Sequence, residues 1–150
     1  MTLDQHERAA TPTGVAARLR SASAPLISGA VVGVACAALV LRDPHGTGSW
    51  GVCPLYGLAG VYCPACGGLR ATHDLLVGDL AGAWAMNPVW VVLAPLVVLL
   101  WARWLVRRWQ GRRADLGIAN RWYVLAFVLL LLYGVARNVP AWSGALAPPG

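Results

Sequence analysis

Residues 91–100 read VVLAPLVVLL, ten consecutive apolar residues without a charge. They lie at the centre of a longer apolar run from Pro88 to Val106. A helix needs about 20 mostly apolar residues to cross a hydrocarbon core that is about 30 Å thick. The run therefore predicts a membrane-spanning helix over residues 88–106, with a kink expected at Pro95.

Two further apolar runs predict two more spans. Residues 25–41 carry no charge and are rich in Ala, Gly and Val, a composition typical of helices that pack closely against other helices. Residues 122–135 are apolar, and the span is expected to extend past Arg137 to residue 139. A cleaved signal peptide is disfavoured for residues 25–41, because the N-terminal extension before them is long and no clean small-X-small site precedes a mature domain. The sequence thus predicts an all-α membrane protein with three transmembrane helices.

The composition agrees with a membrane protein. The chain is 58% hydrophobic and only 12% charged, with a mean hydropathy of +0.59, whereas soluble domains are about 25% charged. Its net charge of +6 comes from arginine alone. Because these arginines flank apolar runs and do not interleave with base-stacking aromatic residues, we expect no nucleic-acid partner. The lipid bilayer is the expected partner.

The distribution of arginine predicts the orientation of the spans. The loop between the second and third runs carries Arg103, Arg107, Arg108, Arg112, Arg113 and Arg121. The first 24 residues carry Arg8, Arg18 and Arg20. The loop at 42–87 holds only Arg42 and Arg70 against three aspartates. Since cytoplasmic loops are enriched in Lys and Arg, we expect a multi-pass protein of the cell membrane with a cytoplasmic N-terminus and the 42–87 loop outside.

The expected organisation has three parts. Residues 1–24 are polar and predict a disordered cytoplasmic tail. Residues 25–141 form the membrane domain, in which residues 50–86 supply a cysteine-rich loop and an interfacial helix. Residues 142–150 are expected to be a flexible C-terminal tail.

The loop carries three of the four cysteines of the chain, Cys53, Cys63 and Cys66; the fourth, Cys36, lies in the first run and is expected to pack there. Three such cysteines can close a disulfide, exchange thiols or give three thiolate ligands to zinc. His73 is the obvious fourth ligand, yet it lies seven residues beyond Cys66. On a continuous helix that is about 10 Å of rise, too far for one zinc ion. His45 is a looser alternative.

Two readings of the Cys63-Pro64-Ala65-Cys66 segment stay open. At the start of a helix the free N–H groups and the helix dipole stabilise a thiolate, which favours redox exchange. A structural disulfide or buried thiol pair is favoured, because nothing here supplies the βαβ context of thioredoxin-like motifs. Whichever pair forms, the odd count leaves one titratable thiol outside the membrane.

Residues 69–86 predict an amphipathic interfacial helix. Its apolar stripe consists of Leu69, Leu76 and Leu80, and Asn87-Pro88 ends it. Arg70 and Asp74 are four residues apart, so the favoured expectation is a helix-surface ion pair. The alternative is that Arg70 bridges the cysteine loop to Asp79 or to a lipid phosphate.

The ordered motifs of this region resemble a known family. They are Cys53-Pro54, Gly57-Leu58, Cys63-Pro64-Ala65-Cys66-Gly67, Arg70-Ala71, Gly78-Asp79, Ala83 and Asn87-Pro88. In this combination the sequence resembles the DUF2752 family of small bacterial membrane proteins over about residues 50–100. The resemblance implies an integral membrane protein with a cysteine-rich loop. It implies no activity, because the family has no characterised function.

We therefore expect a structural or accessory membrane protein whose cysteine loop is stabilised by a disulfide or by a metal such as zinc. It would act through a membrane protein partner or as a homo-oligomer. The alternative is a thiol-disulfide redox protein that uses Cys63 and Cys66, with Cys53 resolving. Other catalysis is disfavoured, because the sequence offers no Ser/His/Asp set and no phosphate-binding loop.

Overall fold

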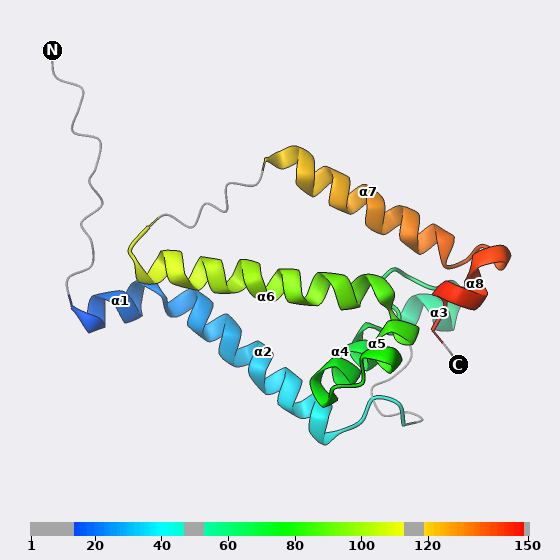
Figure 1. Ribbon diagram of the computed structural model, residues 1–150, viewed down its shortest axis with the longest axis horizontal. Helices are drawn as coiled ribbons and strands as arrows, with labels where there is room; N and C mark the ends of the chain where they lie inside the picture. The colour runs from blue at the N-terminus through cyan, green and yellow to red at the C-terminus, as the bar shows by residue number, and fades with distance from the viewer. Residues whose placement is uncertain (1–13, 47–52, 113–118, 149–150) are drawn as a thin grey trace, which may run out of the picture. The chain divides into compact units, whose positions relative to one another are not determined.

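A computed structural model describes residues 14–46, 53–112 and 119–148 (Figure 1). All regular secondary structure in these ranges is helical, which confirms the all-α class. In chain order the helices are α1 (Val15–Ser21), α2 (Ser23–Leu41), α3 (Pro54–Ala59), α4 (Gly68–Val77), α5 (Leu80–Met86), α6 (Pro88–Trp109), α7 (Asn120–Ala136) and α8 (Pro140–Leu146).

Two of the described helices are long and apolar enough to cross a membrane. They are α2, with 19 residues, and α6, with 22. At 1.5 Å per residue they measure about 28 and about 33 Å. Helix α7 has 17 residues, or about 25 Å, and is short for a span, so the described residues give two candidate spans where the sequence predicts three. The helix ends at Ala136 because Pro140 holds Val139 in an extended conformation, with φ −81° and ψ 124°.

Both predicted tails are partly helical. Residues Val15–Ser21, expected within a disordered tail, form α1. Residues of the expected C-terminal tail belong to α8, which has Pro140 in its first turn, a position where the missing N–H costs no helical hydrogen bond. Residues 1–13 and 149–150 lie outside the described part of the chain.

The chain forms two compact units, whose boundaries fall within α2 after Gly33 and within α6 after Pro95. In the first unit, Trp101 of α6 donates its indole N–H to the Pro25 carbonyl oxygen at 3.1 Å and to Ser28 Oγ at 3.2 Å. Gly29 lies against the same indole ring, where a Cβ would overlap it. A small residue here lets the two helices approach closely, as the Ala- and Gly-rich composition of α2 predicts.

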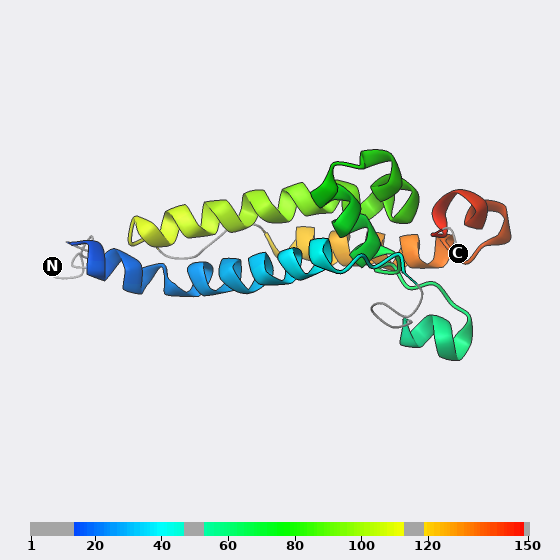
Figure 2. The ribbon, with the colours of Figure 1, turned by 90° about the horizontal axis from the view of Figure 1, so that it is seen from below.

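The second unit contains α4 and α5, which pack side by side at the start of α6 (Figure 2). Its apolar core consists of Ala71, Ala83 and Met86, with Leu75, Trp90 and Val91 packed around them. The leucines of the predicted apolar stripe are exposed instead, Leu69 to 52% and Leu80 to 60%. The buried face of α4 is thus formed by Ala71 and Asp74.

The prediction of one continuous helix over residues 69–86 is wrong. Gly78 ends α4 in the left-handed conformation, with φ 86°, which a glycine adopts without steric cost. Asp79 then starts α5, and its carboxylate accepts the backbone N–H of Gly82 at 2.8 Å. A second break follows at Asn87, which is extended with φ −160°, before α6 begins at Pro88. The break at Gly78 folds α4 and α5 into a helical hairpin, and the break at Asn87 separates α5 from α6.

The cap at Asp79 can be tested by substitution. Removing an N-cap side chain costs about 1 kcal/mol of stability. We expect Asp79→Ala to lower the thermal unfolding midpoint of the purified protein in detergent, measured by circular dichroism. Asp79→Asn is the matched control and should retain most of the stability, because its side-chain oxygen also accepts the Gly82 N–H. Equal loss in both variants would contradict the capping role.

Candidate cysteine site

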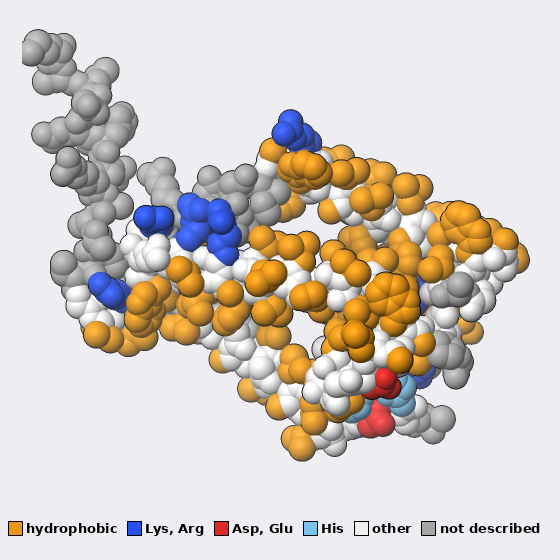
Figure 3. All heavy atoms as spheres, viewed as in Figure 1, with side chains coloured by type: hydrophobic (Ala, Val, Ile, Leu, Met, Phe, Trp, Pro, Cys, Tyr) orange, Lys and Arg blue, Asp and Glu red, His pale blue; other side chains and the backbone are white. Residues whose placement is uncertain are grey.

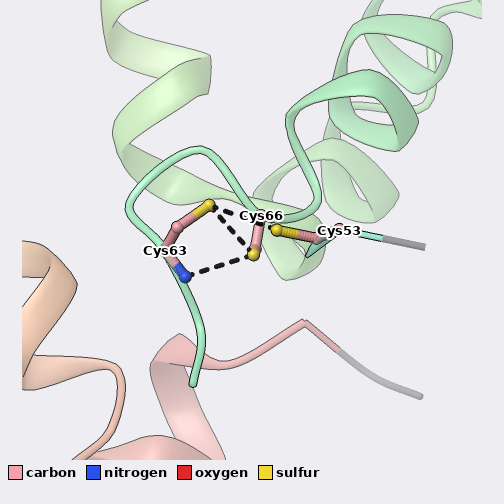
Figure 4. Close-up of side chains that lie close together, drawn as sticks. All are labelled: Cys53, Cys63 and Cys66. Atoms are coloured by element: carbon pink, nitrogen blue, oxygen red, sulfur yellow. Dashed lines mark hydrogen bonds between the residues drawn. The ribbon is translucent and has the colours of Figure 1, made fainter. Parts of the chain in front are cut away.

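The three loop cysteines lie together in the second unit (Figure 4). The Sγ atoms of Cys63 and Cys66 are 3.1 Å apart, and those of Cys53 and Cys63 are 3.8 Å apart. All three sulfur atoms lie within 4.8 Å of one another. Cys53 comes from the residue before α3, whereas Cys63 and Cys66 flank one tight turn. Two separate segments therefore deliver three sulfur atoms to one point.

The turn between Cys63 and Cys66 is shaped by its own backbone. The Cys66 N–H donates to the Cys63 carbonyl oxygen at 3.1 Å, and the Cys63 N–H donates to Cys66 Sγ at 3.2 Å. Gly67 follows with φ 77°, and a Cβ there would lie 2.6 Å from the Met86 carbonyl oxygen. Only glycine fits this position. Helix α4 starts at Gly68, so the cysteine pair precedes the helix and does not open it.

The thiols differ in their chemistry. Burial, followed by the contact with Cys63, raises the pKa of Cys66 to about 12. The pKa of Cys53 is lowered, chiefly by the backbone N–H of Tyr56 in the first turn of α3 and then by the Cys66 thiol. Cys66 is thus held as a neutral thiol in the absence of a metal, while Cys53 ionises more readily than an ordinary cysteine.

A buried arginine binds the carbonyl oxygens of the turn. Arg137 follows α7 and is fully buried. Its guanidinium donates to the Cys66 carbonyl oxygen at 2.8 Å, the Cys63 carbonyl oxygen at 3.3 Å and the Met86 carbonyl oxygen at 3.3 Å. It also lies 5.3 Å from the centre of the Tyr133 ring, within range of a cation–π interaction. The sequence offered this residue only as a charge near the end of an apolar run.

Asn87 completes the same arrangement. Its side-chain N–H₂ donates to the carbonyl oxygens of Pro64 at 3.0 Å and Cys66 at 3.1 Å. Its side-chain oxygen accepts the Trp90 N–H at 3.0 Å and the Tyr133 hydroxyl at 3.2 Å. Asn87 is 2% exposed, and its bond to the Cys66 carbonyl oxygen is buried while the other three are part-buried. Asn87 and Arg137 together form what we call the carbonyl clamp.

The end of α7 also holds the segment before the turn. The Asn138 side-chain oxygen accepts the Tyr62 N–H at 2.8 Å, and its side-chain N–H₂ donates to the Tyr62 carbonyl oxygen, also at 2.8 Å. Pro64 packs against Gly134, where a Cβ would lie 3.1 Å from the proline ring. Sequence reasoning missed Asn138, which carries no signal other than its place after an apolar run.

The remaining residues of interest lie elsewhere in the same unit. Arg70 donates its Nε–H to the Pro44 carbonyl oxygen at 3.3 Å, while Asp74 faces His45 at 3.4 Å. The favoured Arg70–Asp74 ion pair is therefore wrong. His73 belongs with Asp43 and His45 to a second group of metal-binding side chains, apart from the cysteines. Among the described residues, the structure thus brings no histidine into the cysteine site.

The fold and the site define an all-α protein with two helices able to cross a membrane and a clustered set of three cysteines. Residues 53–101 match the model of a family described as "Protein of unknown function (DUF2752)". This match confirms the resemblance seen in the sequence, for the third of the chain that holds the cluster. Neither the curated proteins nor the solved structures include a significant match to the chain.

The carbonyl clamp gives a direct prediction. Arg137→Ala removes the side-chain donor of the Met86 carbonyl oxygen and leaves the Cys63 and Cys66 carbonyl oxygens with one donor each. It also removes a buried charge-assisted interaction, and each unsatisfied buried group costs about 1–3 kcal/mol. We expect this variant to lose most of its cooperative thermal unfolding and to expose the Cys66 thiol to maleimide. Arg137→Lys should recover only part of the stability, because a single ammonium cannot match the spread of a guanidinium.

Arg121→Ala is the matched control, since Arg121 lies on the exposed face of α7. An Arg137→Ala variant as stable as Arg121→Ala would show that the clamp does not support the turn.

Proposed function

We propose that this is a membrane-anchored accessory protein whose Cys53, Cys63 and Cys66 form a structural zinc site. The observation that carries the proposal is the convergence of three sulfur atoms from two segments. Zinc–sulfur bonds of about 2.3 Å in a tetrahedral site place the sulfur atoms about 3.8 Å apart. The Cys53–Cys63 sulfur distance of 3.8 Å matches this value, whereas the Cys63–Cys66 distance of 3.1 Å is shorter and would have to open when a metal binds. A structural disulfide between Cys63 and Cys66 alone would give Cys53 no reason to lie beside them.

Charge balance supports a thiolate metal site. Three thiolates and one Zn²⁺ carry a net charge of −1. Arg137 is buried at the carbonyl oxygens of the same cysteines and supplies a positive charge that no carboxylate within 4.0 Å neutralises among the described residues. A buried cation is costly unless it is compensated. Occupation of the site would therefore stabilise both charges.

A site with three protein ligands leaves the fourth coordination position open. Water would fill it in the isolated protein, and a side chain of a membrane protein partner or of a second copy of the chain would fill it in a complex. This gives an accessory role a physical basis: zinc orders α3 and the turn at 63–67 as one surface, and the partner docks on it.

The arrangement in the membrane follows from the two apolar helices and the arginines. Helices α2 and α6 cross the bilayer, with the N-terminus and the arginine-rich end of α6 in the cytoplasm. The shorter apolar helix α7 then returns across the bilayer, because Arg137 after it binds the turn of the cysteine site. The cysteine site then lies outside the cytoplasm in a multi-pass protein of the cell membrane.

Thiol–disulfide exchange is the alternative, and the close contact of Cys63 with Cys66 favours it. In this role a Cys63–Cys66 disulfide would accept two electrons from a partner dithiol. The partner would become a disulfide, and Cys63 and Cys66 would become thiols. In the first step a partner thiolate would attack Cys63 and release Cys66 as the leaving group, and in the second step the other partner thiol would displace Cys63. A thiol with a pKa of about 12 leaves slowly, so the geometry supports a stable site better than rapid exchange.

Metal content separates the two functions. We expect the full-length protein, purified in nanodiscs without chelator, to contain zinc, and Cys53→Ser to lose one equivalent of it. Cys36→Ser is the matched control and should retain all of it, because Cys36 lies in α2 away from the cluster. Mass spectrometry after maleimide labelling, with and without reduction, reports the thiols. A sample without metal, in which two thiols appear only on reduction, would overturn the zinc site and establish the disulfide.

The orientation has its own test. We expect an impermeant maleimide to label the cysteine site of intact spheroplasts once chelator and reductant are present. A cysteine introduced at Gln110, which is exposed just after α6, should be labelled only after the membrane is opened. The reverse order of labelling would show that the topology is inverted.

A further inference from the structure

A second cluster of metal-binding side chains lies in the second unit, apart from the cysteines. It consists of Asp43 and His45 after α2, and His73 on α4, whose ligand atoms lie within 4.8 Å of one another. Figure 3 shows histidine and acidic side chains gathered in one place on this face. The three residues converge although His73 is 28 positions beyond His45 in the sequence.

His73 uses one ring nitrogen outside the cluster, whereas the ring of His45 makes its hydrogen bond to Asp43 through Nδ1 and places Nε2 beside Asp74. His73 Nδ1 lies 2.8 Å from the Leu39 carbonyl oxygen, which only accepts hydrogen bonds, so Nδ1 must carry the proton. His45 Nε2 lies 3.4 Å from Asp74 Oδ1. Metal-binding histidines almost always donate their other ring N–H to a carbonyl or carboxylate in this way.

The two inner nitrogens then face the same carboxylate. His45 Nδ1 is 2.8 Å and His73 Nε2 is 3.8 Å from Asp43 Oδ1. In neutral imidazoles whose outer nitrogens are protonated, the inner nitrogens carry lone pairs. A proton on His45 Nδ1 joins this ring to Asp43 in the absence of metal. A metal ion would replace that proton and accept the lone pair of His73 Nε2 as well.

Asp74 provides an independent observation. It is 5% exposed, and its Oδ2 atom is buried without a hydrogen-bond partner in the described structure. A buried carboxylate is costly unless a positive charge lies nearby. A cation bound by His45 would supply that charge through the imidazole ring.

We propose that Asp43, His45 and His73 bind a divalent transition-metal ion, with Asp74 as a positioning residue that orients the His45 ring. Two imidazole nitrogens and one carboxylate oxygen suit zinc and neighbouring metals. Bond lengths of about 2.0–2.2 Å in a tetrahedral site place ligand atoms about 3.3–3.6 Å apart. The two histidine–Asp43 distances of 2.8 Å and 3.8 Å bracket that range. The bound metal would tie the residues after α2 to α4.

This inference does not rest on the cysteine site. The test therefore uses the full-length chain in nanodiscs in two forms, the wild type and a variant with Cys53, Cys63 and Cys66 changed to serine. Each is stripped with chelator and titrated with Zn²⁺, and bound metal is measured by mass spectrometry of the metal.

We expect the serine variant still to bind one equivalent of Zn²⁺, and His73→Gln to abolish this binding. Asp74→Asn should weaken it by about 10–100-fold, the usual effect of removing an outer partner of a metal ligand. His6→Gln, which changes the remaining histidine of the chain, is the matched control and should leave the binding unchanged.

If the serine variant is not folded, His73→Gln in the wild-type background provides the second measurement. It should remove one equivalent of zinc while the helical circular dichroism is kept. Nuclear magnetic resonance of ¹⁵N-labelled imidazoles should show the same two rings shifting when Zn²⁺ is added. Unchanged zinc binding in His73→Gln would overturn the proposal, and so would imidazole resonances that do not shift when Zn²⁺ is added. The cluster would then bind protons and no metal. If the wild type and the serine variant each bind the same single equivalent of Zn²⁺, only the zinc site proposed above for the cysteines is overturned.

Discussion

The second unit depends on one interaction, the binding of buried carbonyl oxygens by Arg137 and Asn87. A tight turn directs several carbonyl oxygens to one side, and a buried carbonyl oxygen needs a donor. The guanidinium and the amide supply these donors from the end of α7 and the start of α6. This arrangement holds the turn at 63–67 against the junction between α5 and α6, while the hydrogen bonds within the turn set its own shape.

Local rules predicted much of the helical architecture. Apolar length located α2 and α6, and Asn87-Pro88 marked a break that the structure contains, because a residue before proline is driven out of the helical conformation. Gly78 disfavours a continuous helix at residues 78–79, yet Leu76 before it and Leu80 after it continue the apolar stripe and suggest one helix. The capping of α5 by Asp79 outweighed that stripe. The stripe has no core to cover, since Leu76 and Leu80 are exposed.

The sequence predicts the cysteine cluster but not the grouping of Asp43, His45 and His73 or the burial of Arg137. A Cys-X-X-Cys spacing can be recognised in the sequence as a candidate site, because a single turn brings its two sulfur atoms together. Asp43, His45 and His73 carried no such spacing, and they meet only because α4 folds back against the end of α2. Arg137 was read as a topology signal, since a charge after an apolar run is usually solvated at the membrane surface. Its burial depends on a turn more than 70 residues earlier in the chain, which no local pattern encodes.

The distance along the chain between the clamp and the cysteines determines the order of events during synthesis. Cys53, Cys63 and Cys66 leave the ribosome long before Arg137 does. Until Arg137 has been made, the turn lacks the guanidinium, and Asn87 alone offers it side-chain donors. The nascent protein therefore passes through a period in which its thiols are open to oxidants and to competing metals. A chain interrupted before residue 137 lacks the guanidinium of the carbonyl clamp, so the synthesis of Arg137 is the step that completes the support of the cysteine turn.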